Sequence, residues 1–136
     1  MEIKEAVEFI KENHRGVLAT YRQDGSLQLS PILIGVNEAG QGIISSRETA
    51  YKVNNLRRDP RAYVCVFTDA FFGKWVRVDG TVNILSLPDA LEPLVDYYQR
   101  VVGEHPDWQD YREAMVREKR VLIQLNIDEA GPDHSG

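Results

Sequence analysis

Short strand-forming segments separated by turn signals constrain the fold of this chain more than any other feature. In residues 61–68, alanine and valine alternate with tyrosine, cysteine and phenylalanine, and this period of two predicts a half-buried strand. The pair Asp24-Gly25 is a strong hairpin-turn signal between two such segments. Strands are predicted at residues 16–21, 27–36, 42–46, 61–68, 74–85 and 121–127.

Four regions follow the helical period instead. Helices are predicted at residues 2–13, at 48–58, after Pro88 and at 108–117. The whole pattern is mainly β with peripheral helices, and six antiparallel strands of this length predict a closed or partly closed barrel. A barrel this small is filled by its own side chains, so we expect any ligand outside it or between protomers.

Length and composition indicate one soluble domain. The 136 residues suit a single core, which we assign to residues 1–128, with residues 129–136 as a flexible C-terminal tail. The longest apolar runs are far shorter than the roughly 20 residues that cross a bilayer, and the N-terminus carries no apolar signal segment. The single cysteine, Cys65, cannot form an internal disulfide, which fits a reducing compartment. We therefore expect a cytoplasmic protein.

The charge of the chain is unevenly distributed. The formal net charge is −5, which argues against a general nucleic-acid binder. Residues 47–61, however, hold five basic and two acidic side chains, so this stretch is +3 and the remainder is −8. A local basic segment in an acidic protein favours a small anion as its ligand over a polyanion.

The same stretch has the composition of a phosphate site. Hydroxyl groups at the end of a strand, amides at the start of a helix and converging cationic side chains are what a phosphate requires. The alternative is a solvated basic helix face that binds nothing. The residues concerned are Ser45, Ser46 and Arg47 at the strand end, and Lys52, Asn55, Arg57 and Arg58 on the helix.

Two strands carry further candidates for contacts with a planar ring. Gln28 and Ser30 are two residues apart and therefore project from one face of their strand, with Pro31 just beyond them. Trp75 and Arg77 likewise share a face, where an indole and a guanidinium group suit a flat heterocycle or a subunit interface. A solvent-facing strand explains the first pair equally well, and ordinary cross-strand packing explains the second.

Motifs of other chemistries are missing from the sequence. The three histidines and Cys65 show no metal-ligand spacing, so we predict no metal site. We assign Cys65 to the core or to an interface. There is no glycine-rich dinucleotide motif, P-loop or nucleophile elbow. If the protein is an enzyme, its reactive atom therefore belongs to a cofactor, and we assign no catalytic side chain.

Several segments together resemble one known family. Residues 16–20, the turn at 24–25 and residues 28–31 resemble the opening of the pyridoxamine 5′-phosphate oxidase-like flavin-binding split barrels. Residues 52–61 resemble the helix-and-strand signature of that superfamily. Residues 103–115 are similar to a segment typical of its branch that uses the deazaflavin coenzyme F420. The resemblance covers about residues 7 to 128.

This resemblance implies a fold, a cofactor and an assembly. The fold is the six-stranded antiparallel split β-barrel, in a homodimer with two cofactor sites at the subunit interface. The reaction is hydride transfer between reduced F420 and a conjugated small-molecule acceptor. By resemblance, the ring lies along Gln28, Ser30 and Pro31, the phosphate and acidic tail are held by Ser45, Ser46, Lys52, Asn55 and Arg57, and Trp75 and Arg77 come from a neighbouring strand of the same or the other subunit.

Three alternatives stay open at the level of sequence. The same fold binds FMN in place of F420 in related proteins, and both cofactors carry phosphate. A protein that only stores or shields a flavin or deazaflavin needs the same residues. A structural dimer whose basic helix contacts an acidic partner needs no cofactor at all.

Overall fold

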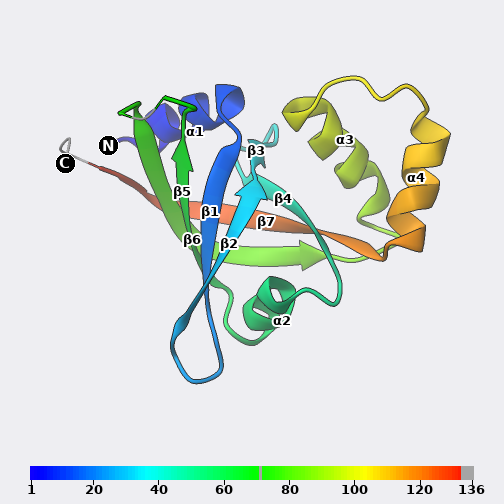
Figure 1. The fold of residues 1–136 in the computed structure, drawn as a ribbon, viewed down its shortest axis with the longest axis horizontal. Helices are drawn as coiled ribbons and strands as arrows, with labels where there is room; N and C mark the ends of the chain where they lie inside the picture. The colour runs from blue at the N-terminus through cyan, green and yellow to red at the C-terminus, as the bar shows by residue number, and fades with distance from the viewer. Residues whose placement is uncertain (71, 133–136) are drawn as a thin grey trace.

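The computed structural model describes residues 1–70 and 72–132 (Figure 1). Over this part of the chain there are four helices and seven strands. The mainly β composition with peripheral helices is therefore confirmed. In chain order the elements are α1 (Ile3–Glu12), β1 (Arg15–Tyr21), β2 (Leu27–Leu33), β3 (Gly35–Val36), β4 (Gly42–Arg47), α2 (Tyr51–Arg58), β5 (Arg61–Phe67), β6 (Trp75–Leu85), α3 (Leu91–Val101), α4 (Trp108–Arg117) and β7 (Arg120–Gly131).

All the strands join one antiparallel sheet in the order β2-β1-β5-β6-β7-β4-β3. The sheet curls so far that β2, at one edge, also contacts β4 near the other edge (Figure 1). The result is the predicted split barrel, but it has seven strands and not six. The additional strand is β3, because the strand predicted over residues 27–36 is interrupted at Ile34. The backbone amide of Ile34 donates a hydrogen bond to the carbonyl oxygen of His14 (2.8 Å).

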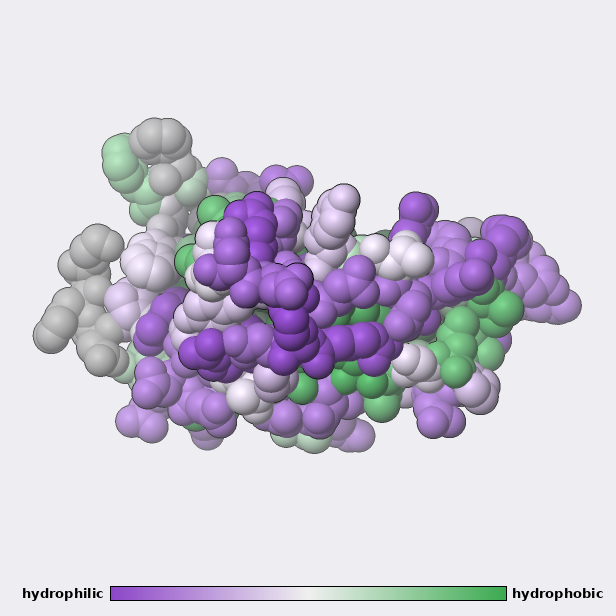
Figure 2. All heavy atoms as spheres, turned by 90° about the horizontal axis from the view of Figure 1, so that it is seen from below, coloured by the Kyte–Doolittle hydropathy of each residue, from purple (hydrophilic) through white to green (hydrophobic). Residues whose placement is uncertain are grey.

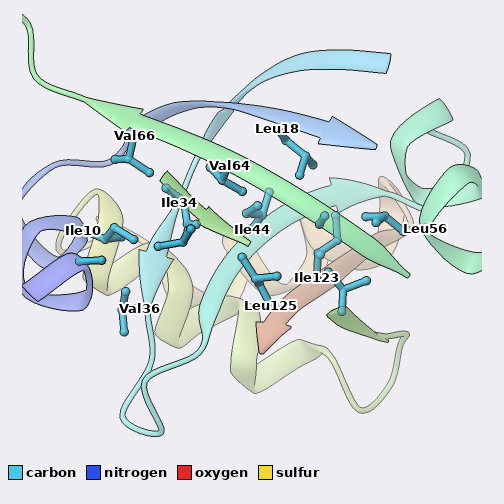
Figure 3. Close-up of a cluster of buried hydrophobic side chains, with 14 of the residues drawn as sticks. Ile10, Leu18, Ile34, Val36, Ile44, Leu56, Val64, Val66, Ile123 and Leu125 are labelled. Carbon is cyan, nitrogen blue, oxygen red and sulfur yellow. The ribbon is translucent and has the colours of Figure 1, made fainter. Parts of the chain in front are cut away.

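The barrel interior is filled by one face of each long strand, as the period-two alternation predicts. Leu18, Val64 and Val78 are paired in register on β1, β5 and β6, and none is more than 1% exposed. Ile44 and Ile123 are paired on the opposite wall, on β4 and β7 (Figure 3). Apolar side chains therefore occupy the interior, and a ligand site has to lie outside it.

Helices α1 and α2 close the barrel core with their apolar faces. Ala6 and Ile10 of α1 are fully buried in the main core, as is Val53 of α2, with Leu56 nearly so. Residues three or four apart in a helix lie on the same face, so each of these short helices buries one apolar face. This packing fixes the start of α2, and with it the basic residues of that helix, against the end of the barrel.

A second apolar cluster lies between the sheet and the pair α3–α4. These two helices lie side by side at one end of the molecule (Figure 1). Ile43 and Leu122 supply the sheet side of this cluster, and Leu94, Tyr97 and Tyr111 supply the helix side. The outward faces of β4 and β7 are therefore covered, whereas the outward face of β2 keeps several exposed leucines.

Helix α2 begins at Tyr51, three residues later than predicted. The backbone amide of Glu48 donates to the carbonyl oxygen of Lys119 at the start of β7 (2.9 Å). Residues 48–50 are therefore held by the sheet as a turn. Within the described residues no helix is both long and apolar enough to span a bilayer.

Strand β7 continues beyond the predicted end of the domain. It pairs with β6 as far as Gly131, which lies opposite Arg77. A register shift after Asp79 lets β6 pass β7 closely at Gly80, where a Cβ would collide with the carbonyl oxygen of Asn126. Residues 129–131 of the predicted tail thus belong to the sheet, and residues 133–136 lie outside the described residues.

Candidate cofactor-binding site

Strand β2 has one unpaired edge. It is the last strand of the sheet and pairs only with β1. At one end of the strand, Arg22 Nη1 donates to the carbonyl oxygen of Leu27 (2.9 Å). At the other end, the Tyr97 hydroxyl donates to the carbonyl oxygen of Leu33 (2.8 Å). Because the backbone groups of alternate residues point to the same edge, the carbonyl groups of residues 29 and 31 face this edge between the two closed ends.

The predicted residue Pro31 fits this position. Proline has no N–H to contribute to a ladder and is tolerated where a strand edge is unpaired. The middle of β2 therefore offers acceptor groups to a ligand at an edge that no other strand occupies. A heterocycle with N–H donors along one side is the kind of ligand that such an edge can hold.

Gln28 and Ser30 share a face, as predicted. They are paired in register with Thr20 and Leu18, whose side chains point into the barrel. Both polar residues are half-buried, on the inward face of β2. The amide oxygen of Gln28 accepts a hydrogen bond from Arg22 Nη2 (3.0 Å). One of the two side chains is therefore already oriented by the protein.

Three cationic side chains gather where β4, α2 and β7 meet. Arg47, the last residue of β4, is paired in register with Arg120, the first residue of β7. Lys52 lies in the first turn of α2 and is half-buried. Burial lowers the pKa of Lys52, and the charge of the nearby Arg120 lowers it further. We call Arg47, Lys52 and Arg120 the cation cluster.

One carboxylate, that of Glu118, partly neutralises the cation cluster. Its Oε1 atom accepts hydrogen bonds from Arg120 Nε (3.1 Å) and Nη2 (2.9 Å). The same oxygen lies 3.8 Å from Arg47 Nη2. Lys52 makes no ion pair within the described residues, so the cluster with Glu118 keeps two positive charges. Like charges directly opposite on neighbouring strands are unfavourable, and a bound anion removes that cost.

The two predicted serines have different surroundings. Ser45 is half-buried on the outward face of β4, the face that also carries Arg47. Its backbone contacts Tyr97, whose pKa is raised by burial and lowered to a lesser extent by a hydrogen bond from Ser45. Ser46 faces the interior and is only 3% exposed. Ser45 is thus beside the cation cluster, whereas the Ser46 side chain is turned away from it.

Asn55 is used inside the protein. Its side chain is buried, donates to the Thr20 hydroxyl (3.1 Å) and accepts from Arg58 Nη2 (2.9 Å). Arg58 also donates to the carbonyl oxygen of Tyr21 (3.2 Å). These bonds attach α2 to β1, so Asn55 and Arg58 position the helix.

Arg57 is already paired. Its Nη2 atom donates to both carboxylate oxygens of Glu48 (2.7 and 2.9 Å) and to the Ser86 hydroxyl (3.1 Å). Contact between Arg57 and a phosphate therefore requires exchange of this exposed ion pair. Of the basic residues predicted on α2, Lys52 alone belongs to the cation cluster.

Trp75 and Arg77 lie on the outward face of β6. This strand is three positions from β2 in the sheet. Within one chain these two residues are therefore not beside the unpaired edge of β2. Arg77 Nη1 lies 3.2 Å from Asp79 Oδ2 in an ion pair whose geometry does not make a hydrogen bond. The expectation that Trp75 and Arg77 serve the site of another subunit remains a prediction.

Sequence reasoning missed Arg120, Glu118 and Tyr97. Arg120 directly precedes the last predicted strand, but only the pairing of β4 with β7 brings it to Arg47.

Seen from below, the side of the molecule with α2 and the β1–β2 turn is largely hydrophilic, with hydrophobic atoms visible between the polar ones (Figure 2). The surface around the site is thus predominantly polar.

One known family matches the stretch of the chain that contains both β2 and the cation cluster. The sequence profile of the family described as pyridoxamine 5′-phosphate oxidase matches residues 3–132. The chain belongs to the pyridoxamine 5′-phosphate oxidase family. The match includes β2, the cation cluster and every strand, so the family resemblance seen in the motifs is confirmed.

Solved structures of similar fold have varied names. A conserved hypothetical protein from Mycobacterium tuberculosis is 24% identical, with a TM-score of 0.78 over 100% of this chain and 92% of that one. A protein named F420 reductase is 18% identical, with a TM-score of 0.71 over 91% and 94% of the two chains. The heme storage protein HutZ from Vibrio cholerae is 14% identical, with a TM-score of 0.71 over 96% and 94%. At these identities the likeness shows the fold.

Proposed function

We propose that this member of the pyridoxamine 5′-phosphate oxidase family is an oxidoreductase that uses coenzyme F420. One observation carries the proposal. A half-buried lysine without an ion pair in the described residues lies in a cluster of three cations, close to a barrel whose edge strand is unpaired. A ligand with a phosphate at one end and a hydrogen-bonding ring at the other matches both features.

The residues present fit such a cofactor. Arg47, Lys52 and Arg120 hold its phosphate, and the two charges that Glu118 leaves uncompensated are available to it. The hydroxyl of Ser45 lies on the same face and can donate to a phosphate oxygen. The unpaired edge of β2 holds the polar side of the ring, and Gln28 and Ser30 add side-chain contacts.

In the reaction the protein mainly provides orientation. A reduced deazaflavin supplies a hydride to a conjugated acceptor, and the carbon atom that carries it belongs to the cofactor. The edge of β2 would hold the polar side of the ring, and the cation cluster would hold the phosphate. Restricting the ring and the acceptor to one geometry lowers the barrier by removing their independent motion.

Three observations favour F420 over FMN. Residues 103–115 resemble the F420-using branch, and one structure of the same fold is named F420 reductase. F420 also carries an acidic tail beyond its phosphate, and a cluster with two excess positive charges suits a ligand with several anionic groups. FMN in the same position, or storage of either cofactor without turnover, is the alternative that the experiment below distinguishes.

We also propose that the working unit is a homodimer. The outward faces of β2, β5 and β6 expose large apolar side chains, and Leu29 is 61% exposed. Contiguous apolar surface of this kind marks an interaction site. Such a surface can pair with the same surface of a second copy about a twofold axis. The exposed apolar residues are Leu27, Leu29, Leu33, Phe67 and Trp75, which we call the open face.

The direct test is a titration of the purified apo-protein with F420 and with FMN, followed by the fluorescence of each cofactor. We expect micromolar or tighter binding of F420 and much poorer binding of FMN. Lys52→Ala should weaken F420 binding at least tenfold, because a charge-assisted hydrogen bond is lost. Lys4→Ala, which removes an exposed lysine of α1, is the matched control.

Each other outcome has a definite meaning. A preference for FMN moves the protein to the flavin-using branch of the family. Binding of F420 without oxidation of its reduced form by any conjugated acceptor makes the protein a carrier. Failure to bind either cofactor overturns the proposal. Because HutZ is named a heme storage protein, hemin belongs in the same titration.

A further inference from the structure

Glu118 occupies the position at the cation cluster where the anionic group of a ligand would bind. Its Oε1 atom accepts two hydrogen bonds from Arg120 and lies 3.8 Å from Arg47. By accepting these hydrogen bonds, the Glu118 carboxylate occupies the guanidinium N–H groups that a phosphate or carboxylate of a ligand would use. The protein's own side chain and an incoming anion therefore compete for Arg120.

We propose that Glu118 is a built-in competitor at the anion site, and that Arg120, which it holds, is a specificity-determining residue for the anionic group of the cofactor. The inference rests on the proposed function in placing the cofactor's anionic end at this cluster. It goes further in assigning roles to two residues that lie outside the basic segment 47–61. The ligand class is a small organic or inorganic phosphate.

The position of Glu118 allows it to be displaced. It directly follows α4, as the residue that caps the helix C-terminus, and its side chain is 31% exposed. The pair with Arg120 is partly exposed on both sides. Such pairs contribute little to stability, since the charges remain hydrated and the side chains lose freedom when they pair. An anion with two negative charges can therefore replace one carboxylate at modest cost.

The remaining charges around Arg120 make displacement favourable. Lys52 and Arg47 are both close to Arg120, and each is a cation. A single carboxylate leaves two positive charges uncompensated, whereas the phosphate and acidic tail of F420 together, or the phosphate monoester of FMN with about 1.5 to 2 negative charges at pH 7, can compensate both. The neighbouring Tyr97 and Tyr111 hydroxyls both donate to backbone carbonyl groups. Burial raises the pKa of each, and the charge of Arg120 lowers it to a lesser extent. They are therefore neutral at pH 7 and add no competing charge.

The test measures binding of inorganic pyrophosphate, F420 and FMN to four variants by calorimetry. We expect Glu118→Gln to tighten pyrophosphate binding several-fold, because the competing charge is removed while the shape is kept. Arg120→Gln should weaken binding roughly tenfold, the scale of one charge-assisted interaction. Glu113→Gln and Arg117→Gln change the net charge by the same amounts at exposed positions of α4 and should leave the affinity within twofold of wild type.

The outcomes separate this inference from the proposed function. If F420 binds wild type and binds Lys52→Ala more weakly, as the proposed function expects, but Glu118→Gln and Arg120→Gln bind every probe like their controls, the inference is wrong and the proposed function stands. If pyrophosphate responds as expected while neither cofactor binds, the anion site is real and the oxidoreductase proposal fails. Equal tightening by Glu118→Gln and Glu113→Gln would reduce the effect to net charge and overturn the competitor role. Circular dichroism of each variant verifies that it is folded.

Discussion

At the scale of single residues, the Tyr97 hydroxyl connects two parts of the fold that are distant in sequence. It extends from α3 to the carbonyl oxygen of Leu33 at the end of β2 and also contacts the backbone of Ser45 on β4. These two strands approach each other across the curled sheet without pairing. One side chain thus sets the spacing of the two strands that carry the candidate site.

Tyr97→Phe tests this role. The substitution removes the hydrogen bond to the partly buried Leu33 carbonyl, so we expect a loss of about 1 kcal/mol in the free energy of unfolding. Urea unfolding measures it. Tyr98→Phe is the control, because the Tyr98 hydroxyl makes no hydrogen bond in the described part of the chain. Equal losses in the two variants would contradict the role of the Tyr97 hydroxyl.

Lys52 gives a prediction about pH. Its pKa is lower in the folded protein than the ordinary value of 10.5, chiefly because of burial. The folded state therefore binds this proton less tightly than the unfolded state does. The resulting cost to stability is fully present below the folded pKa and disappears as the pH rises toward the unfolded value.

Lys52→Met removes the titrating group while keeping a long apolar side chain. We expect the stability of the variant relative to wild type to be highest near pH 8 and to decline as the pH rises to 11. Chemical unfolding at a series of pH values measures this difference. The exposed Lys4→Met should show no such trend, and a flat profile for Lys52→Met would mean that the lysine is not strained in the apo-protein.

At the scale of elements, α2 is attached to the barrel by polar as well as apolar contacts. Asn55, Thr20 and Arg58 form a connected set in which the buried Asn55 amide both donates and accepts. The helix that carries Lys52 therefore has a fixed position relative to β1. A mobile helix would lose much of its ability to direct a charge at a ligand.

Asn55→Ala separates a structural role from a binding role. The change leaves the buried Thr20 hydroxyl without the Asn55 donor and removes one of the two hydrogen bonds of Arg58, so we expect about 1–3 kcal/mol of destabilisation in thermal or urea unfolding. Asn54→Ala, at an exposed position of the same helix, should be nearly neutral. A variant that keeps its stability but loses cofactor affinity would show that Asn55 contacts the phosphate, as the resemblance first implied.

Much of the architecture follows from local sequence patterns, whereas the site follows from long-range pairing. Alternation along β5 and β6 correctly identified their buried faces, because a side-chain period of two survives in any sheet. The break at Ile34 could not be predicted, because it lies where the chain stops pairing with β1 at Leu33 and starts pairing with β4 at Gly35. Arg120 was missed for a similar reason: only the register of β4 against β7 brings it to Arg47.

The segment that suggested F420 has a structural role in the fold. His105, Trp108 and Tyr111 pack with Tyr98 in an aromatic cluster whose ring centroids are 5.0 to 5.7 Å apart. This cluster connects α3 to α4. The motif that resembles the F420-using branch therefore holds α3 and α4 together.

At the scale of the whole molecule, the uncovered side of the sheet is the open face. The α3–α4 pair covers only the outward faces of β4 and β7. The apolar side chains on β2, β5 and β6 thus remain exposed in one chain, although they would be buried against a second copy. A cofactor at the edge of β2 would then lie near the partner.

Leu29→Lys tests the assembly. Leu29 is the most exposed leucine of the open face at 61%, and a lysine there would place a charge inside an apolar interface. We expect sedimentation to show a dimer for wild type and a dissociation constant at least roughly tenfold higher for the variant. Val116→Lys, at a 56% exposed position on α4, should remain dimeric. A wild type that is monomeric at micromolar concentration would contradict the proposed homodimer.

The central claim is that the cation cluster holds the phosphate of a deazaflavin whose ring lies along β2. The most direct measurement is a crystal structure of the protein with F420 bound. The account predicts the phosphate within hydrogen-bond distance of Lys52 and Arg120, with Glu118 turned away and the ring along the middle of β2. A cofactor bound elsewhere, with Glu118 still on Arg120, would contradict it.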